Sequence, residues 1–130
     1  MKISVVVLNK NFGKYLENTL DAILSQDYSN FEVIVIDGGS SDNSLEILKK
    51  YTNRIQWISE TDNGHGEGVY KGIRMSTGDI ITFQASDDLL YPSALSRVSE
   101  YFNNHPDIVG LYGLTTNIGS NGEDLPSGYF

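Results

Sequence analysis

The sequence of 130 residues predicts one α/β domain, built on a mostly parallel open sheet with helices on both faces. Three observations lead to this prediction. Short apolar runs rich in β-branched residues alternate with segments of helical periodicity from residue 3 to residue 115. Polar turns, several of them containing glycine, separate the two kinds of segment. Asn121-Gly122 is a strong turn signal, so a small antiparallel hairpin is expected at the C-terminus.

The first half of the chain predicts two strands, each followed by a helix. Residues 4–8, SVVVL, form a continuous apolar run that is typical of a central strand buried on both faces. Apolar residues at helical spacing predict a helix over 15–26 that packs on the sheet. A second strand is predicted over 31–36, and Ser41 or Asp42 can cap the helix after it. The inner face of that helix is predicted to consist of Leu45, Leu48 and Tyr51.

The middle of the chain predicts a weaker strand over 55–59, a loop over 60–68 and a short helix over 69–78. Three glycines within nine residues, ETDNGHGEG, indicate the loop. The side chains of Asp62, His65 and Glu67 within it are interpreted as solvated. The two acids could instead meet a substrate or a metal ion.

A short buried strand over 80–83 is predicted to deliver two adjacent carboxylates, Asp87 and Asp88, at its C-terminal end. Pro92 suits the first turn of the next helix, which is predicted to end near Asn104. Open α/β sheets bind ligands at this edge, and Mg²⁺ and Mn²⁺ take oxygen ligands of this kind. The same residues also form a good N-cap cluster, so helix capping is the alternative interpretation.

Asp37 stands at the end of the second predicted strand, on the same edge of the sheet. Gly38 and Gly39 would let a ligand approach the backbone, and a carboxylate there can accept from a ribose hydroxyl or a base N–H. The alternative is that residues 37–42 are only a tight turn and a helix cap. The loop over 9–14 leaves the first strand at this edge and could line a base pocket, although it lacks the dinucleotide and P-loop glycine patterns.

The end of the chain predicts one more strand over 108–115. A hairpin over 117–130 is predicted to follow and to turn at Asn121-Gly122. It would add a short antiparallel piece to the otherwise parallel sheet.

Composition excludes several classes of protein. A formal net charge of −8 argues against nucleic-acid binding. The absence of cysteine excludes disulfides and thiolate metal sites. No apolar run approaches the roughly 20 residues of a membrane helix, and the start lacks a signal-peptide pattern, so a cytoplasmic location is expected. A phosphate about 4 Å from a lone carboxylate would be repelled by about 4 kcal/mol at an effective dielectric near 20. A phosphorylated ligand beside Asp87 therefore needs a bridging cation, a helix N-terminus, or both.

Taken together, these segments resemble the family 2 glycosyltransferases, inverting enzymes with the Rossmann-like GT-A fold. The resemblance covers about residues 3–115. It rests on SVVVLNKN at 4–11, VIDGGSSD at 35–42, the Glu60-x-Asp62-x-Gly64 loop, Thr77-Gly78-Asp79, and FQASDD at 83–88 followed by Tyr91-Pro92. Each motif alone is weak, and it is their order and spacing that make the resemblance specific.

The resemblance implies roles for the matching positions. The nucleotide base would be held by Leu8, Asn9 and Asn11. Asp37 would hydrogen-bond base or ribose. Asp87, supported by Asp88, would coordinate a divalent cation, Mn²⁺ or Mg²⁺, that bridges the diphosphate and stabilises the departing nucleotide. Two positions depart from the family pattern: Ala85 replaces the first acid of the metal motif, and Gly38 stands where a second Asp is frequent.

The resemblance also implies the reaction, which is inverting sugar transfer from a nucleotide-diphosphate sugar to an acceptor hydroxyl of a saccharide or lipid-linked saccharide. Such a role belongs to polysaccharide or cell-wall biosynthesis, and the chain could lie at the inner face of a membrane. Residues 1–130 are expected to form one nucleotide-sugar-binding domain, truncated before the acceptor-binding half, and no catalytic base is assigned. The alternative is a non-catalytic nucleotide-binding or partner-docking module that keeps the fold.

Overall fold

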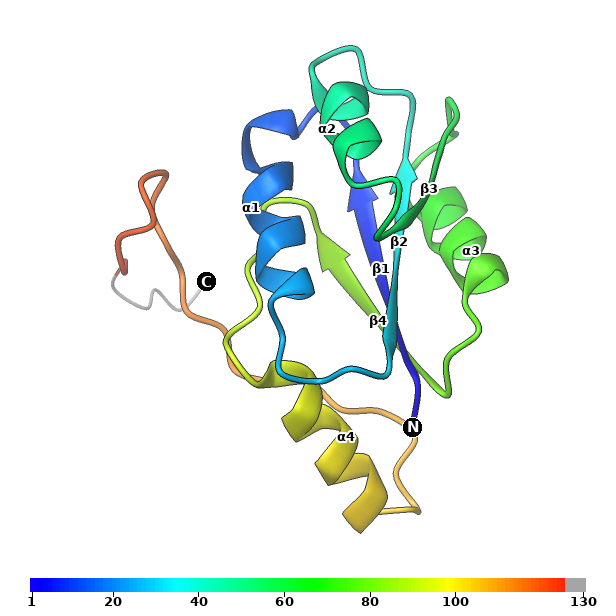
Figure 1. Ribbon diagram of the computed structural model, residues 1–130, viewed down its shortest axis with the longest axis vertical. Coiled ribbons are helices and arrows are strands. Elements are labelled where there is room, and N and C mark those ends of the chain that lie inside the picture. Colours follow the sequence, from blue (N-terminus) through cyan, green and yellow to red (C-terminus); the bar gives the residue numbers. More distant parts are fainter. Residues whose placement is uncertain (126–130) are drawn as a thin grey trace.

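A computed structural model describes residues 1–125 of the chain and shows four strands and four helices in alternation (Figure 1). In chain order the elements are β1 (Ile3–Asn9), α1 (Gly13–Leu24), β2 (Phe31–Asp37), α2 (Ser44–Lys50), β3 (Gln56–Ser59), α3 (His65–Met75), β4 (Ile80–Ala85) and α4 (Ala94–Asn104). The predicted alternation is confirmed. Among these residues, no helix is both long enough and apolar enough to cross a membrane.

The four strands form one parallel sheet in the order β3-β2-β1-β4. Asn9 of β1 pairs with Asp37 of β2, and Leu8 of β1 pairs with Ala85 of β4, so the carboxyl ends of these strands meet at one edge. The chain moves outward from β1 through β2 to β3 and then returns to the other side of β1. The carboxyl ends beside β1 are therefore a topological switch point, where ligands bind in open α/β sheets.

Helices cover both faces of the sheet, as predicted (Figure 1). Val5 and Val7 of β1 are fully buried in the larger core cluster, which also contains the inward residues of α1 and α2. Val6, on the opposite face of β1, belongs to a second cluster with Ile34 and Ile36, against which Met75 of α3 packs. This alternation explains why residues 5–8 are apolar without interruption.

Helix α3 begins at His65, inside the segment predicted as a loop, so the prediction of a loop over 60–68 is wrong for its last four residues. Glycines in this segment serve packing as well as turning. A Cβ on Gly68 would lie 3.4 Å from Leu8 Cδ2, and a Cβ on Gly72 would lie 2.4 Å from Val6 Cγ1. The first separation is an ordinary van der Waals contact, so only at Gly72 does the helix approach β1 more closely than a side chain would allow.

Replacing Gly72 by alanine is expected to lower the free energy of unfolding by about 1–3 kcal/mol, because the new methyl group overlaps Val6. Gly66→Ala is the matched control in the same helix, since a Cβ there meets nothing within 4 Å. That variant should be neutral or up to about 1 kcal/mol more stable, because alanine favours helix. Urea unfolding of both variants measures the difference, and equal stability of the two would refute the close-packing argument.

The strand predicted over 108–115 is absent from the structure, which shows no regular element there. Val109, Tyr112 and Leu114 are almost completely exposed. The segment has strand-forming residues, and residues 108–111 line one pocket together with Ile80–Thr82 of β4, but they do not pair with the free edge of that strand. The hairpin begins as predicted: Ile118 bridges Asp124 in antiparallel fashion and Gly122 has a φ of 81°. Most of its second arm, residues 126–130, lies outside the described residues.

Candidate functional site

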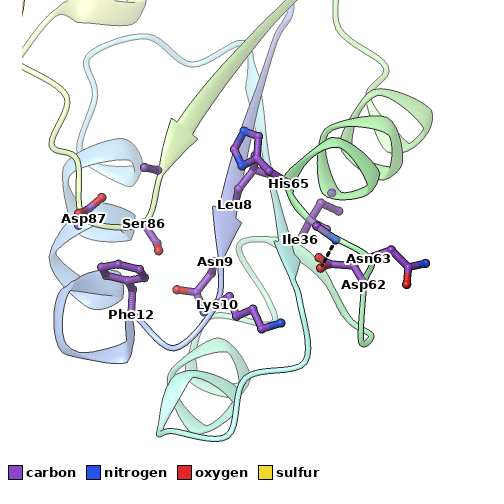
Figure 2. Close-up of a pocket in the computed structure, with 13 residues that line it drawn as sticks. Leu8, Asn9, Lys10, Phe12, Ile36, Asp62, Asn63, His65, Ser86 and Asp87 are labelled. Atoms are coloured by element: carbon purple, nitrogen blue, oxygen red, sulfur yellow. Dashed lines mark hydrogen bonds between the residues drawn. The ribbon is translucent and has the colours of Figure 1, made fainter.

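A pocket of about 680 Å³ opens at the carboxyl ends of β1, β2 and β4, and the start of α3 forms one of its walls (Figure 2). We call it the strand-end pocket. It is lined by Leu8, Asn9, Lys10, Phe12, Ile36, Asp62, Asn63, Gly64, His65, Gly68, Ala85, Ser86 and Asp87. Its size lies within the range of small-molecule sites, and its position is the switch point of the sheet.

The predicted site residues fall into two groups. Leu8, Asn9 and Asp87 line the strand-end pocket. Asp37 lies behind it, at the same sheet edge, and is only 1% exposed. The structure thus brings Asp37 and Asp87 to one end of the sheet, on the two sides of β1, but only Asp87 faces the pocket.

The Asp37 carboxylate is the centre of a dense hydrogen-bond network. Its Oδ1 accepts from Asn9 Nδ2 at 2.8 Å and from the Ser40 hydroxyl at 2.5 Å. Its Oδ2 accepts from the Ser59 hydroxyl at 2.7 Å and from the backbone N–H groups of Ser40 and Gly39 at 2.9 and 3.2 Å. Burial raises the pKa of Asp37, but the hydrogen bonds from Ser40, Ser59 and Asn9 outweigh it and hold this pKa below its usual value.

The Asn9 side chain is oriented by Asp37. An ionised carboxylate only accepts hydrogen bonds, so the Asn9 amide must turn its NH₂ group toward Asp37. Its Oδ1 is then left without a hydrogen-bond partner within residues 1–125, although Asn9 is only 4% exposed and lines the pocket. A buried acceptor without a partner is costly. A ligand that brings an N–H or O–H group to Asn9 would satisfy it.

Asn11 and Asp42 fix the loops behind the pocket instead of lining it. Asn11 has a φ of 57°, its backbone N–H donates to the Ser40 hydroxyl at 2.8 Å, and its Oδ1 accepts from the Ser41 N–H at 2.8 Å. Asp42 accepts from the N–H groups of Gly13 and Ser44, the first residues of α1 and α2. The N-cap of α2 is Asn43, so the prediction that Ser41 or Asp42 occupies this position is wrong; Asp42, one residue earlier, accepts from the first N–H of the helix and ties the turn after β1 to the turn after β2.

Asp87 presents its carboxylate from the loop after β4 (Figure 2). Thr19 of α1 anchors this loop by donating from its hydroxyl to the backbone carbonyls of Ser86 and Asp88, at 2.8 and 2.9 Å. The Asp87 side chain is exposed and makes no hydrogen bond within residues 1–125. The Asp88 side chain is exposed as well but is not part of the pocket lining.

One free carboxylate in a pocket fits a divalent cation of the magnesium type. No cluster of three or more potential protein ligands occurs among residues 1–125, so a cage made entirely of protein ligands is absent there. Mg²⁺ does not require one, because it is usually held by one or two carboxylates together with substrate phosphates and water. Asp87 could provide the protein's part of such a site.

Three side chains that contact the pocket were interpreted from the sequence as solvated or only as part of a loop. Asp62, Asn63 and His65 come from the connection between β3 and α3 and lie on the side of the pocket opposite Asp87 (Figure 2). Phe12, from the turn after β1, exposes 44% of its surface beside Asp87. The sequence signals for this side of the pocket were the alternative interpretation of Asp62 as a substrate or metal contact and the Glu60-x-Asp62-x-Gly64 motif; the glycines at 64, 66 and 68 match no phosphate-binding pattern.

Comparison with known proteins identifies similar chains. The family model described as glycosyl transferase family 2 matches residues 4–127. An uncharacterised glycosyltransferase of Nostoc sp. is 32% identical over 115 residues, which cover 85% of this chain and 35% of that protein. The poly(ribitol-phosphate) beta-N-acetylglucosaminyltransferase TarS of Staphylococcus aureus is 29% identical over 136 residues, which cover 100% of this chain and 23% of that protein.

Two solved structures show the same architecture. The crystal structure of S. aureus TarS 1-349 in complex with UDP-GlcNAc matches with a TM-score of 0.74 at 28% identity, covering 82% of this chain and 32% of that one. Glucosyl-3-phosphoglycerate synthase from Mycobacterium tuberculosis, in complex with Mn²⁺, UDP and glucosyl-3-phosphoglycerate, matches with a TM-score of 0.56 at 26% identity, covering 65% and 33%. The chain therefore spans about a third or less of each of these two chains.

Proposed function

The chain belongs to glycosyl transferase family 2, and on that premise we propose that it supplies the nucleotide-sugar-binding part of a glycosyltransferase. The donor is a nucleotide-diphosphate sugar, and the acceptor is a hydroxyl of a saccharide or lipid-linked saccharide. Transfer inverts the configuration of the sugar. A role in polysaccharide or cell-wall biosynthesis fits this chemistry, and a location in the cytoplasm at the inner face of a membrane stays a prediction.

The observation that carries the proposal is the presence of one buried, unpaired acceptor and one exposed carboxylate in the same pocket. Asn9 offers a buried carbonyl oxygen and Asp87 offers a free carboxylate. A nucleoside brings N–H and O–H donors, which suit Asn9. A diphosphate requires a cation beside a carboxylate, because direct contact would be repulsive. A nucleoside diphosphate with a bound metal ion provides both the donors for Asn9 and the cation for Asp87.

Each predicted residue takes a role in this proposal. Leu8 and Asn9 contact the nucleotide base, and Asn11 supports them by holding the turn after β1. Asp37 acts on the base or ribose through the orientation it imposes on Asn9. Asp87, supported by Asp88, would hold Mn²⁺ or Mg²⁺, which when bound stabilises negative charge on the diphosphate as a Lewis acid. The complex of the M. tuberculosis synthase with Mn²⁺ and UDP supports this choice of cation.

The acceptor site and the base that deprotonates the acceptor hydroxyl are proposed to belong to a part of the enzyme outside residues 1–130. This follows the length of the relatives, of which the chain matches only 23% in TarS and 35% in the Nostoc protein. Within the described residues, the strand-end pocket contains no acid other than Asp62 and Asp87.

Nucleoside diphosphates are expected to raise the melting temperature of the chain when Mn²⁺ is present. A ligand at about 100 times its Kd stabilises the folded state by about 2.7 kcal/mol, which corresponds to a shift on the order of 10 °C for a domain of this size. A thermal-shift panel of nucleoside diphosphates and their sugars, with and without Mn²⁺ or Mg²⁺, measures this. Absence of any shift across the panel would contradict the proposed function. Turnover of a nucleotide sugar by residues 1–130 alone would contradict the placement of the base.

A further inference from the structure

Gly38 and Asp62 share one space at the end of β2. A Cβ built on Gly38 would lie 2.8 Å from Asp62 Oδ2, so the Asp62 carboxylate occupies the position where a side chain of residue 38 would begin. Gly38 does not have a positive φ, unlike its neighbour Gly39 at 83°. Its backbone conformation therefore does not require glycine, and a side chain at this position would displace the Asp62 carboxylate.

The two oxygens of Asp62 have different surroundings. Oδ1 accepts from the Gly64 N–H at 3.1 Å, which fixes the orientation of the carboxylate at the start of α3. Oδ2 makes no hydrogen bond within residues 1–125. It lies beside Gly68, whose absent side chain leaves Leu8 and Ile36 as an apolar wall next to it. An unpaired acceptor beside a flat apolar wall suits the polar edge of a planar ring.

We propose that Asp62 is the residue that recognises the nucleobase, by accepting a hydrogen bond from a ring N–H on the pairing edge of uracil or guanine. This inference rests on the proposed function and deepens it. Cytosine and adenine carry a bare ring nitrogen at the corresponding place, and two acceptors facing one another repel. Asp62 therefore selects uridine or guanosine diphosphates over cytidine and adenosine diphosphates.

The charges of the pocket also favour an orientation of the ligand with its base toward Asp62. Asp62 and Asp87 lie on opposite sides of the pocket (Figure 2). A diphosphate is repelled by Asp62 and attracted to a cation held by Asp87. The neutral base is thus directed toward Asp62, at the ends of β1 and β2, and the diphosphate toward the end of β4.

The test is calorimetric titration of wild type, Asp62→Asn and Asp62→Ala with uridine, guanosine, cytidine and adenosine diphosphates in the presence of Mn²⁺. Wild type should bind the uridine or the guanosine compound at least tenfold more tightly than the other two. Asp62→Ala should lose about 10- to 100-fold in affinity for the preferred nucleotide, as expected for a hydrogen bond to a charged group, and little for cytidine diphosphate. In Asp62→Asn the amide oxygen accepts from the Gly64 N–H and the NH₂ group replaces Oδ2, so this variant should lose at least as much for the preferred nucleotide and bind cytidine diphosphate more tightly than wild type. The N3-methylated form of uridine diphosphate, or the N1-methylated form of guanosine diphosphate, should bind wild type as weakly as the variants bind the parent compound.

A second experiment moves the carboxylate from residue 62 to residue 38. Gly38→Asp combined with Asp62→Ala places a carboxylate in the same space from the other strand end and should restore part of the base preference. Gly38→Asp alone should weaken binding, because the new side chain collides with Asp62. Unchanged binding in Asp62→Ala, or an equal loss of affinity for all four nucleotides, would overturn the inference about Asp62. The proposed function would still stand in that case, provided that wild type binds a nucleotide. Failure of wild type to bind any of the four would overturn the proposed function itself.

Discussion

Replacing Asp87 by asparagine is expected to weaken Mn²⁺-dependent binding of a nucleoside diphosphate by about 100-fold or more. Asp87 is the pocket carboxylate nearest the end of β4 and is free of protein hydrogen bonds within residues 1–125. Removing its charge takes away the attraction to the cation, which is worth a few kcal/mol at a separation of about 4 Å in a partly solvated site. Isothermal titration with and without Mn²⁺ measures the change.

The matched control for this experiment is Asp107→Asn. Asp107 is an exposed acid after α4, and its replacement changes the net charge by the same amount. Its binding should equal that of wild type. If Asp87→Asn kept the affinity and the Mn²⁺ dependence of wild type, Asp87 would not be a cation ligand.

Replacing Asp37 by asparagine is expected to cost about 3–5 kcal/mol in the free energy of unfolding. The carboxylate accepts five hydrogen bonds from the turn after β2, from Asn9 and from Ser59. An amide at this position turns an NH₂ group toward these donors and leaves some of them buried without a partner. Urea unfolding measures the loss. Ser59→Ala, which removes a single donor, should cost only about 1 kcal/mol, and a similar cost for both variants would refute the network as described.

The stabilisation by Asp37 should disappear in acid. Hydrogen bonds hold its pKa in the folded state below the usual value of 3.8, although burial acts in the opposite direction. A lowered pKa means that the contribution is complete above the unfolded-state value and is lost as the pH falls through the folded-state value. The difference in unfolding free energy between wild type and Asp37→Asn should therefore be constant near pH 7 and shrink below about pH 4. A difference that did not change with pH would show that the carboxylate charge is not the cause.

The alternation of strands and helices could be predicted from the sequence because burial on two faces leaves a clear pattern. Residues 5–8 are apolar throughout since Val5 and Val7 face one core cluster and Val6 faces the other. Parallel strands also meet with their carboxyl ends at one edge, so the common position of Asp37 and Asp87 followed from the fold.

The parts that could not be predicted depend on contacts between distant segments. Helix α3 includes Gly66 and Gly68, which disfavour helix by themselves, and the approach of α3 to β1 leaves no room for a side chain at Gly72. Residues 108–115 have the composition of a strand, yet they do not pair with the free edge of β4, which lines a pocket with residues 108–111.

The site was predictable only as an edge of the sheet, not as a set of contacts. The sequence located Asp37 at a strand end. It did not reveal that the carboxylate is buried and accepts hydrogen bonds from the Ser40 N–H, in the turn after β2, and from the Ser59 hydroxyl, in β3. Asp62 could be named from the sequence as an acid that could meet a substrate or a metal ion, but the position of its carboxylate in the space above Gly38 depends on the packing of two distant segments.

The measurement that tests the central claim most directly is a crystal structure of the chain with a nucleoside diphosphate and Mn²⁺, recorded with anomalous data at the manganese edge. The account predicts that the base lies between Asn9 and Asp62 and that an anomalous manganese peak lies within about 2.5 Å of an Asp87 carboxylate oxygen. The same manganese ion should also be bound by the diphosphate. A nucleotide bound outside the strand-end pocket, or manganese bound away from Asp87, would contradict it.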